Sequence, residues 1–358
     1  MGKLLTMWAM RTRCTHDSHT SPRILLIVTL ALLPGGAMGR ADISNPQANA
    51  KARDILAYIQ GLSSRADRKI LSGEFTAFAP KASLALPEAT FQQTGHWPAY
   101  LGVGYRNFDD GSIDCSMANR VALEYWQAGG LVEVSVHLRN PLDSTRGGGL
   151  RDRSVNLPDL LVPGSPANTA WNEELDLIAA GLGELQAHGV VVLWRPFHEM
   201  NGAWFWWGNK PPEDFKRLWR YTFDYLTKTK GLNNLIWIYS PNMGPNAATY
   251  YPGGEYVDIV GLDAYTDSVD TTHVGGYGDL ARLGKPFGFG EFGPHAPKNP
   301  PGDYDYRRWV PAVEQGFPLT SFFMTWNAKW SPPNNLHARE FFNDPMIVNR
   351  EDLPRWRE

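Results

Sequence analysis

The segment Val190-Val191-Val192-Leu193-Trp194 decides the fold class of this chain. Its five residues are apolar without a break, which is typical of a strand that is buried on both faces of a parallel sheet. Similar segments recur along the chain, separated by helical patterns. Eight strands alternating with helices predict an α/β fold, a single (β/α)8 TIM barrel. The predicted strands cover residues 69–76, 98–105, 131–138, 190–197, 235–242, 257–265, 286–292 and 321–327.

The segments between these strands carry the apolar spacing of amphipathic helices. In one of these segments, apolar residues recur at intervals of four, three, four and three residues, at Trp171, Leu175, Ile178, Leu182 and Leu185. Links from strand to helix, such as 139–169 and 243–255, are longer than links from helix to strand. Because barrel enzymes build their sites from the loops after the strands, we expect the active site at the C-terminal ends of the strands.

Residues 1–41 are predicted to form a secretory signal peptide and leader. Basic residues precede an apolar run at 24–33, and small residues follow at 37–39, which is the order of a signal with its cleavage site. The run is too short to span a bilayer, which needs about 20 residues. We therefore expect a secreted or periplasmic protein whose catalytic barrel covers residues 42–358, with no membrane contact after cleavage.

Composition excludes several classes of partner. The 358 residues carry a net charge of -3 and show no basic stripe, so neither nucleic acid nor a membrane surface is an expected partner. The 14 Trp, 14 Tyr and 16 Phe suit a large core, and their flat rings also suit the apolar faces of sugars. Histidines show no metal-ligand spacing. We expect a monomer without cofactor or metal.

Two glutamates stand at the ends of predicted strands. Glu199 follows the fourth strand, and Glu291 ends the seventh in Gly290-Glu291-Phe292-Gly293. Carboxylates at the C-terminal ends of two strands can meet across the mouth of a parallel barrel. Hydrolysis of a glycoside with retention needs two carboxyl groups about 5–5.5 Å apart. Glu199 and Glu291 are therefore the candidate catalytic pair.

The residues around this pair resemble glycoside hydrolase family 26, which is dominated by β-mannanases. The run from Arg195-Pro196-Phe197-His198-Glu199 to Gly208 closely resembles the acid/base segment of that family, and 261–265 is similar to its sixth strand. Thr325-Trp326-Asn327 also fits the eighth strand. The resemblance covers the chain from about residue 50 onward. It implies a retaining endo-β-1,4-mannanase that hydrolyses mannan, galactomannan or glucomannan by double displacement.

The resemblance also implies a role for each matched residue. Glu199 would be the acid/base, with a pKa raised by the aromatic wall and by the charge of Glu291, the nucleophile. Tyr265 and His198 would hydrogen-bond to the nucleophile and orient it. Arg195 is more typical of a structural ion-pair partner than of a sugar ligand. The expected substrate-binding residues are His137, His198, Trp204 beside the acid/base, Trp207, Asp263, Tyr265 and Trp326 beneath the attacked sugar. For Trp207 core packing is an equal alternative, since alternation places Trp206 and Trp207 on opposite sides, and for Asp263, on the strand face of Tyr265, the alternative is a supporting role behind the sugar contacts.

Other substrates fit the same motifs. Relatives in this family cleave β-1,3-1,4-glucan or β-xylan, and an exopolysaccharide is a further alternative, because loops rather than strand motifs read the 2-hydroxyl of the sugar. A more distant alternative is a barrel that binds polysaccharide without cutting it. Asn327 stands where mannanases of this family can carry a basic residue that helps to bind a more distant sugar. Because of this departure, the sequence assigns no residue to the binding of that more distant sugar.

Overall fold

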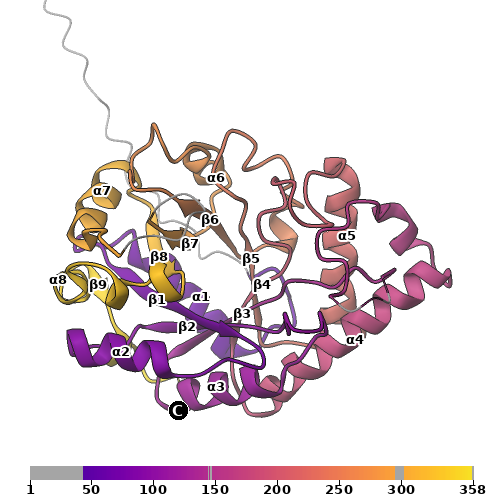
Figure 1. Cartoon of the computed structure of the whole chain (residues 1–358), viewed down its shortest axis with the longest axis horizontal. Helices are drawn as coiled ribbons and strands as arrows, with labels where there is room; N and C mark the ends of the chain where they lie inside the picture. The colour runs from indigo at the N-terminus through magenta and orange to yellow at the C-terminus, as the bar shows by residue number, and fades with distance from the viewer. Residues whose placement is uncertain (1–42, 144, 146, 295–301, 357–358) are drawn as a thin grey trace, which may run out of the picture. The chain divides into compact units, whose positions relative to one another are not determined.

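A closed parallel barrel forms the centre of the chain in the computed structural model, which describes residues 43–143, 145, 147–294 and 302–356 (Figure 1). β1 pairs in parallel with both β2 and β8, and this closes the barrel. The predicted (β/α)8 barrel is therefore confirmed. Its strands are β1 (Ile70–Phe78), β2 (Tyr100–Gly104), β3 (Leu131–Ser135), β4 (Val192–Arg195), β5 (Leu235–Tyr239), β6 (Ile259–Tyr265), β7 (Phe287–Gly293) and β8 (Thr320–Thr325).

A ninth strand, β9 (Ile347–Val348), extends the sheet outside the barrel. It pairs in parallel with the beginning of β1, where Ile70 lies opposite Ile347. All eight predicted strands overlap an observed strand, whereas β9 was not predicted. Two residues are too few to show the alternation by which a strand is recognised in a sequence.

Helices surround the barrel in Figure 1. The five apolar positions predicted for one helix face are all buried in α4. α4 begins after Ser165, whose hydroxyl accepts a hydrogen bond from the N–H of Asn168 at 3.1 Å, as a helix cap does. The helices are α1 (Ala50–Leu62), α2 (Ala85–Thr94), α3 (Ser116–Gln127), α4 (Pro166–Ala187), α5 (Pro212–Asp224), α6 (Tyr277–Ala281), α7 (Trp309–Gly316) and α8 (Ala338–Phe342).

Tryptophans fill much of the layer between the barrel and its helices. Trp194 on β4 meets Trp237 on β5 edge to face, with ring centroids 6.5 Å apart, and Trp219 on α5 lies 6.0 Å from Trp237. Seven tryptophans of the described residues are fully buried and therefore serve the core rather than a sugar site. The fully buried ones are Trp171, Trp194, Trp206, Trp207, Trp219, Trp237 and Trp309.

The predicted leader, 1–41, lies outside the described residues. Within the described part of the chain, no helix has both the length and the apolar character needed to cross a membrane.

Candidate active site

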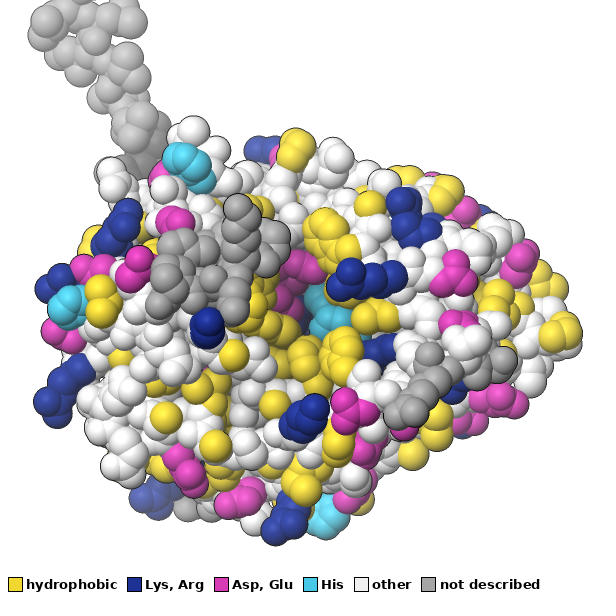
Figure 2. Space-filling view, in the orientation of Figure 1, with side chains coloured by type: hydrophobic (Ala, Val, Ile, Leu, Met, Phe, Trp, Pro, Cys, Tyr) yellow, Lys and Arg dark blue, Asp and Glu magenta, His cyan; other side chains and the backbone are white. Residues whose placement is uncertain are grey.

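A cavity of about 680 Å³ opens at the C-terminal ends of the strands. Figure 2 shows this face hollowed, with histidine and acidic side chains lying deep between hydrophobic ones. The long loops after the strands lie at the same end of the barrel, where a site was expected. The cavity is lined by His137, Arg151, His198, Glu199, Trp204, Asn242, Met243, Tyr265, Glu291, Trp326 and Trp330.

Glu199 and Glu291 come together in this cavity. One carboxylate oxygen from each, and one from Asp263, lie within 4.8 Å of one another. Retaining glycosidases hold their two carboxyl groups about 5–5.5 Å apart, whereas inverting ones leave about 6.5–9.5 Å for a water molecule. Three such carboxylates could also surround a cation, but the guanidinium of Arg195 already contacts Asp263 and Glu291. The spacing suits a nucleophile and an acid/base.

A tight turn after β4 aims Glu199 at the cavity. Phe197 and Glu199 have positive φ angles of 50° and 55°, a left-handed conformation that costs a non-glycine residue roughly 1–3 kcal/mol. The N–H of Glu199 donates to the carbonyl of Ser240 at 2.7 Å, and this bond ties the turn to the end of β5. The indole N–H of Trp204 donates to Oε2 of Glu199 at 2.6 Å. The carboxyl is thus fixed from both its backbone and its tip.

Glu199 has the protonation behaviour of a general acid. Burial, and secondly the negative charge of Glu291, raise the pKa of Glu199 to about 8. The hydrogen bond from Trp204 and the charge of Arg195 act in the opposite direction without cancelling this effect. A carboxyl group with such a pKa holds its proton at neutral pH, so it can give that proton to a leaving oxygen.

Glu291 is held at both of its oxygens. Arg195 Nη2 donates to Oε1 at 2.8 Å, and the hydroxyl of Tyr265 donates to Oε2 at 2.6 Å. Glu291 lies near the end of β7 and is only 4% exposed, so its carboxylate can be approached only from the cavity. The predicted contact between Tyr265 and the nucleophile is present.

Arg195 joins a buried layer of carboxylates inside the barrel. Besides Glu291, it contacts Glu133 on β3 at 2.8 Å and Asp263 on β6 at 3.3 Å. Arg195 is fully buried, and it is the ion-pair partner that the sequence indicated. Burial and the charge of Glu291 raise the pKa of Asp263 well above its usual range. Loss of this arginine would leave uncompensated buried acids, which is strongly destabilising.

Two predicted substrate-binding residues lie beneath the cavity and not in its lining. Asp263 shares a strand face with Tyr265 but lies two residues deeper along β6, or about 6.6 Å, and it is fully buried. Trp207 is also fully buried, and its indole N–H donates to the carbonyl of His198 at 3.0 Å. Neither side chain is among those that line the cavity, so direct contact of either one with sugar stays a prediction. Trp207 thus contacts a residue that lines the cavity, whereas Asp263 contacts Arg195, which in turn holds Glu291.

His198 contacts a different partner from the one predicted. Its Nε2 lies 3.3 Å from Nε2 of His137, while the described partners of Glu291 are Arg195 and Tyr265. Burial lowers the pKa of His137 to about 3 and that of His198 well below its usual range, so both rings are neutral at neutral pH. The pair therefore forms an uncharged wall of the cavity, and His198 does not directly orient Glu291.

Four residues of the lining were not predicted from the sequence: Arg151, Asn242, Met243 and Trp330. Each follows a strand in a loop or short turn, where no periodicity marks the direction of a side chain. The predicted residues Trp204 and Trp326 do line the cavity. The ring of Trp326 stacks on that of Phe75, with the ring centroids 4.2 Å apart. Asn327 donates to the carbonyl of Thr76 at 3.2 Å, so its amide is used within the fold.

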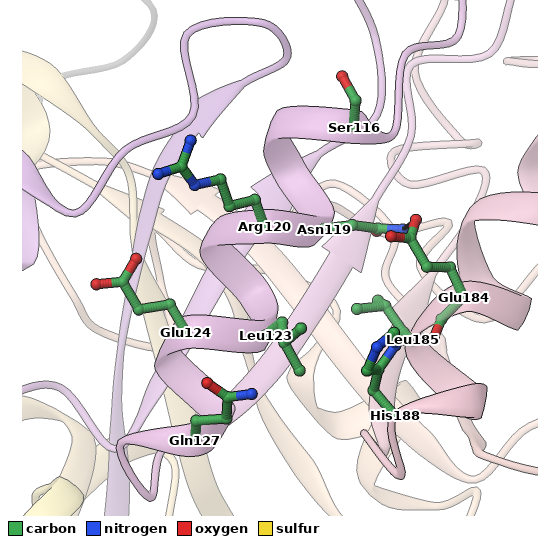
Figure 3. A pocket seen from close by; sticks show the side chains of 9 residues that line it. All are labelled: Ser116, Asn119, Arg120, Leu123, Glu124, Gln127, Glu184, Leu185 and His188. Atoms are coloured by element: carbon green, nitrogen blue, oxygen red, sulfur yellow. Dashed lines mark hydrogen bonds between the residues drawn. The ribbon is translucent and has the colours of Figure 1, made fainter.

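A second cavity, of about 510 Å³, lies on the outside of the barrel between α3 and α4 (Figure 3). Two of its polar side chains are joined by the 2.7 Å hydrogen bond from Asn119 to Glu184. No Trp, Tyr or Phe side chain lines it. This cavity therefore lacks the tryptophan platform for a sugar that the barrel mouth provides.

Comparison with known proteins agrees with this geometry. A "Mannan endo-1,4-beta-mannosidase" of Bacillus subtilis strain 168 is 35% identical over 86% of this chain and 88% of its own length. A "Mannan endo-1,4-beta-mannosidase A and B" of Caldalkalibacillus mannanilyticus is 36% identical over 87% of this chain, which spans 63% of that relative. The structure of a Bacillus subtilis mannanase superposes with a TM-score of 0.80 at 34% identity, covering 87% of this chain and 95% of that one.

A family model supplies the assignment. The model described as "Glycosyl hydrolase family 26" matches residues 44–352, which include the whole barrel, the cavity and both glutamates. A glycoside hydrolase acts on a glycosidic bond, and the paired carboxyl groups at the ends of β4 and β7 are the chemical equipment for that reaction. The chain belongs to glycosyl hydrolase family 26.

Proposed function

We propose that this chain is a retaining endo-β-1,4-mannanase that hydrolyses mannan, galactomannan or glucomannan. The observation that carries the mechanism is the approach of Glu199 and Glu291 to within 4.8 Å at the mouth of the barrel. The endo action and the mannan substrate rest on the relatives, which are named mannan endo-1,4-β-mannosidases at 33–36% identity over most of this chain.

In the first step, an oxygen of Glu291 attacks the anomeric carbon of the sugar above it. The bond from that carbon to the glycosidic oxygen breaks as Glu199 gives its proton to the departing oxygen. Arg195 and Tyr265 hold the attacking carboxylate in place through the contacts at 2.8 and 2.6 Å. Trp326 provides a flat floor for the sugar, and His137 a hydrogen-bonding wall. The product of this step is a covalent glycosyl-enzyme.

In the second step, the ionised Glu199 takes a proton from a water molecule that attacks the anomeric carbon. The bond to Glu291 breaks, and the sugar leaves with the configuration it had at the start, because two inversions have occurred. Glu199 is protonated again for the next cycle. The aromatic residues Trp204, Trp326 and Trp330 surround this reaction and reduce the access of bulk water.

The proposal includes the location and the oligomeric state of the enzyme. The predicted signal at 1–41 supports a secreted or periplasmic enzyme with its catalytic domain at 42–358, acting as a monomer on a polysaccharide outside the cytoplasm. A polysaccharide that cannot enter the cell has to be cut where an exported enzyme can meet it.

Parallel assays of reducing-sugar release test the substrate. We expect the mature chain to release reducing ends from mannan, galactomannan and glucomannan, with Glu291→Ala as the blank. Lichenan and xylan serve as comparison polymers. Release from lichenan or xylan alone would keep the mechanism and disprove the mannan assignment. Absence of release from all five would point to an exopolysaccharide substrate, or to a barrel that binds without cutting.

A further inference from the structure

Arg151 presents a positive charge to the cavity. It lines the cavity from the loop between β3 and α4, and its side chain is exposed. Among the described residues, its guanidinium has no hydrogen-bond or ion-pair partner. The buried arginine of the same site, Arg195, contacts three carboxylates. An arginine carries five N–H donors in a fixed fork, and no residue in the described part of the chain uses those of Arg151, so they can serve a ligand.

The backbone on both sides of Arg151 is attached to the segment that carries Trp204. The carbonyl of Leu150 accepts a hydrogen bond from the N–H of Trp206 at 3.0 Å. The ammonium of Lys210 donates to the carbonyls of Arg153 and Val155 at 2.7 and 2.6 Å. The loop is therefore held in place, and ordering it costs little when a ligand binds.

This attachment places Arg151 on one side of the bond that is cut. Trp204, in the attached segment, donates to the acid/base Glu199, which serves the departing oxygen. The nucleophile Glu291 is instead held by Tyr265, and Trp326 and Trp330 follow β8. The side of the cavity formed by Trp204 and Arg151 is thus the side on which the leaving sugar lies.

We propose that Arg151 is a specificity-determining residue that binds the hydroxyl groups of the sugar on the leaving-group side of the cut. This inference rests on the proposed hydrolytic function and deepens it. The guanidinium donates hydrogen bonds to the departing sugar, and later to a sugar acceptor that competes with water for the glycosyl-enzyme. It touches no group of the sugar attached to Glu291.

The variant Arg151→Ala tests this assignment with two substrates. Manno-oligosaccharides place a sugar on the leaving-group side, whereas an activated aryl mannobioside places only an aryl group there. We expect kcat/KM on mannohexaose to fall about 10- to 100-fold, the range for lost hydrogen bonds to a charged donor, with kcat/KM on the aryl substrate within about twofold of the parent. Arg151→Lys should recover part of the loss.

A second measurement is the fate of the glycosyl-enzyme. With the aryl substrate as donor and mannobiose added as acceptor, the parent should form transfer products, and Arg151→Ala should form far fewer relative to hydrolysis. Arg153→Ala is the matched control, because Arg153 is an exposed arginine of the same loop that is not part of the cavity lining. It should match the parent in both assays.

Two results would overturn the proposal. One is an equal loss on the oligosaccharide and on the aryl substrate, which would indicate a structural or general catalytic effect. The other is an Arg151→Ala variant whose kcat/KM on both substrates and whose yield of transfer products equal those of the parent. A parent enzyme that cuts neither substrate would instead refute the proposed mannanase function, so the two failures are distinguishable.

Discussion

Replacing Glu291 with alanine lowers the turnover of every β-linked substrate by about 10⁵-fold or more, because removal of a covalent nucleophile has effects of this size. No other carboxyl of the described cavity lining can replace it, since Glu199 stands on the leaving-group side. Steady-state assays on mannan and on an activated aryl mannobioside measure the loss, which should be the same for both substrates.

A small nucleophile distinguishes this loss from misfolding. Added azide should enter the space left by the Glu291 side chain and yield an α-mannosyl azide from the aryl substrate, because one displacement inverts the anomeric carbon. Glu291→Gln retains the volume of the side chain and should be equally inactive without rescue. Full activity of either variant, or a β-mannosyl azide from Glu291→Ala, would contradict the assignment of Glu291.

Replacing Glu199 with alanine has a large effect that depends on the leaving group. Hydrolysis of mannan should fall by roughly 10³- to 10⁴-fold, within the range for loss of general acid catalysis. An aryl group that leaves as a stable anion needs no proton, so formation of the glycosyl-enzyme should be largely spared. Stopped-flow measurements should then show a burst of released aryl group before a slow steady state, and azide should yield a β-mannosyl azide.

The pH dependence gives an independent test of Glu199. The parent needs this carboxyl in its protonated form, and its pKa is raised to about 8. Activity on mannan should therefore fall as the pH rises through about 8, and this alkaline limb should be absent from Glu199→Ala with the aryl substrate. Equal losses on both substrates, or an unchanged alkaline limb, would remove Glu199 from the acid/base role.

The sequence was most informative where strands carry the chemistry. Apolar runs mark buried strands, so their ends locate Glu199 and Glu291 at the barrel mouth. The same alternation correctly placed Asp263 and Tyr265 on one strand face. Alternation could not show that Asp263 lies deeper in the barrel than Tyr265. There Asp263 contacts Arg195 at 3.3 Å and does not line the cavity.

The sequence was least informative in the loops. Trp207 follows Trp206 in an irregular segment, and both are fully buried there, so no periodicity in the sequence shows which way either side chain points. Arg151 and Trp330 reach the cavity from loops whose path depends on contacts between distant segments, such as the bond from Trp206 to Leu150. The pairing of His198 with His137 likewise depends on how β3 and β4 lie side by side.

The anomeric configuration of the first product tests the central claim most directly. Proton NMR spectra recorded during the first minutes of mannan hydrolysis distinguish new β reducing ends from the α form that appears later by mutarotation. Two carboxyl groups within 4.8 Å predict that the β anomer appears first. An α anomer that appears first would show inversion and contradict the assignment of Glu291 as nucleophile, and absence of new reducing ends would contradict the mannanase function itself.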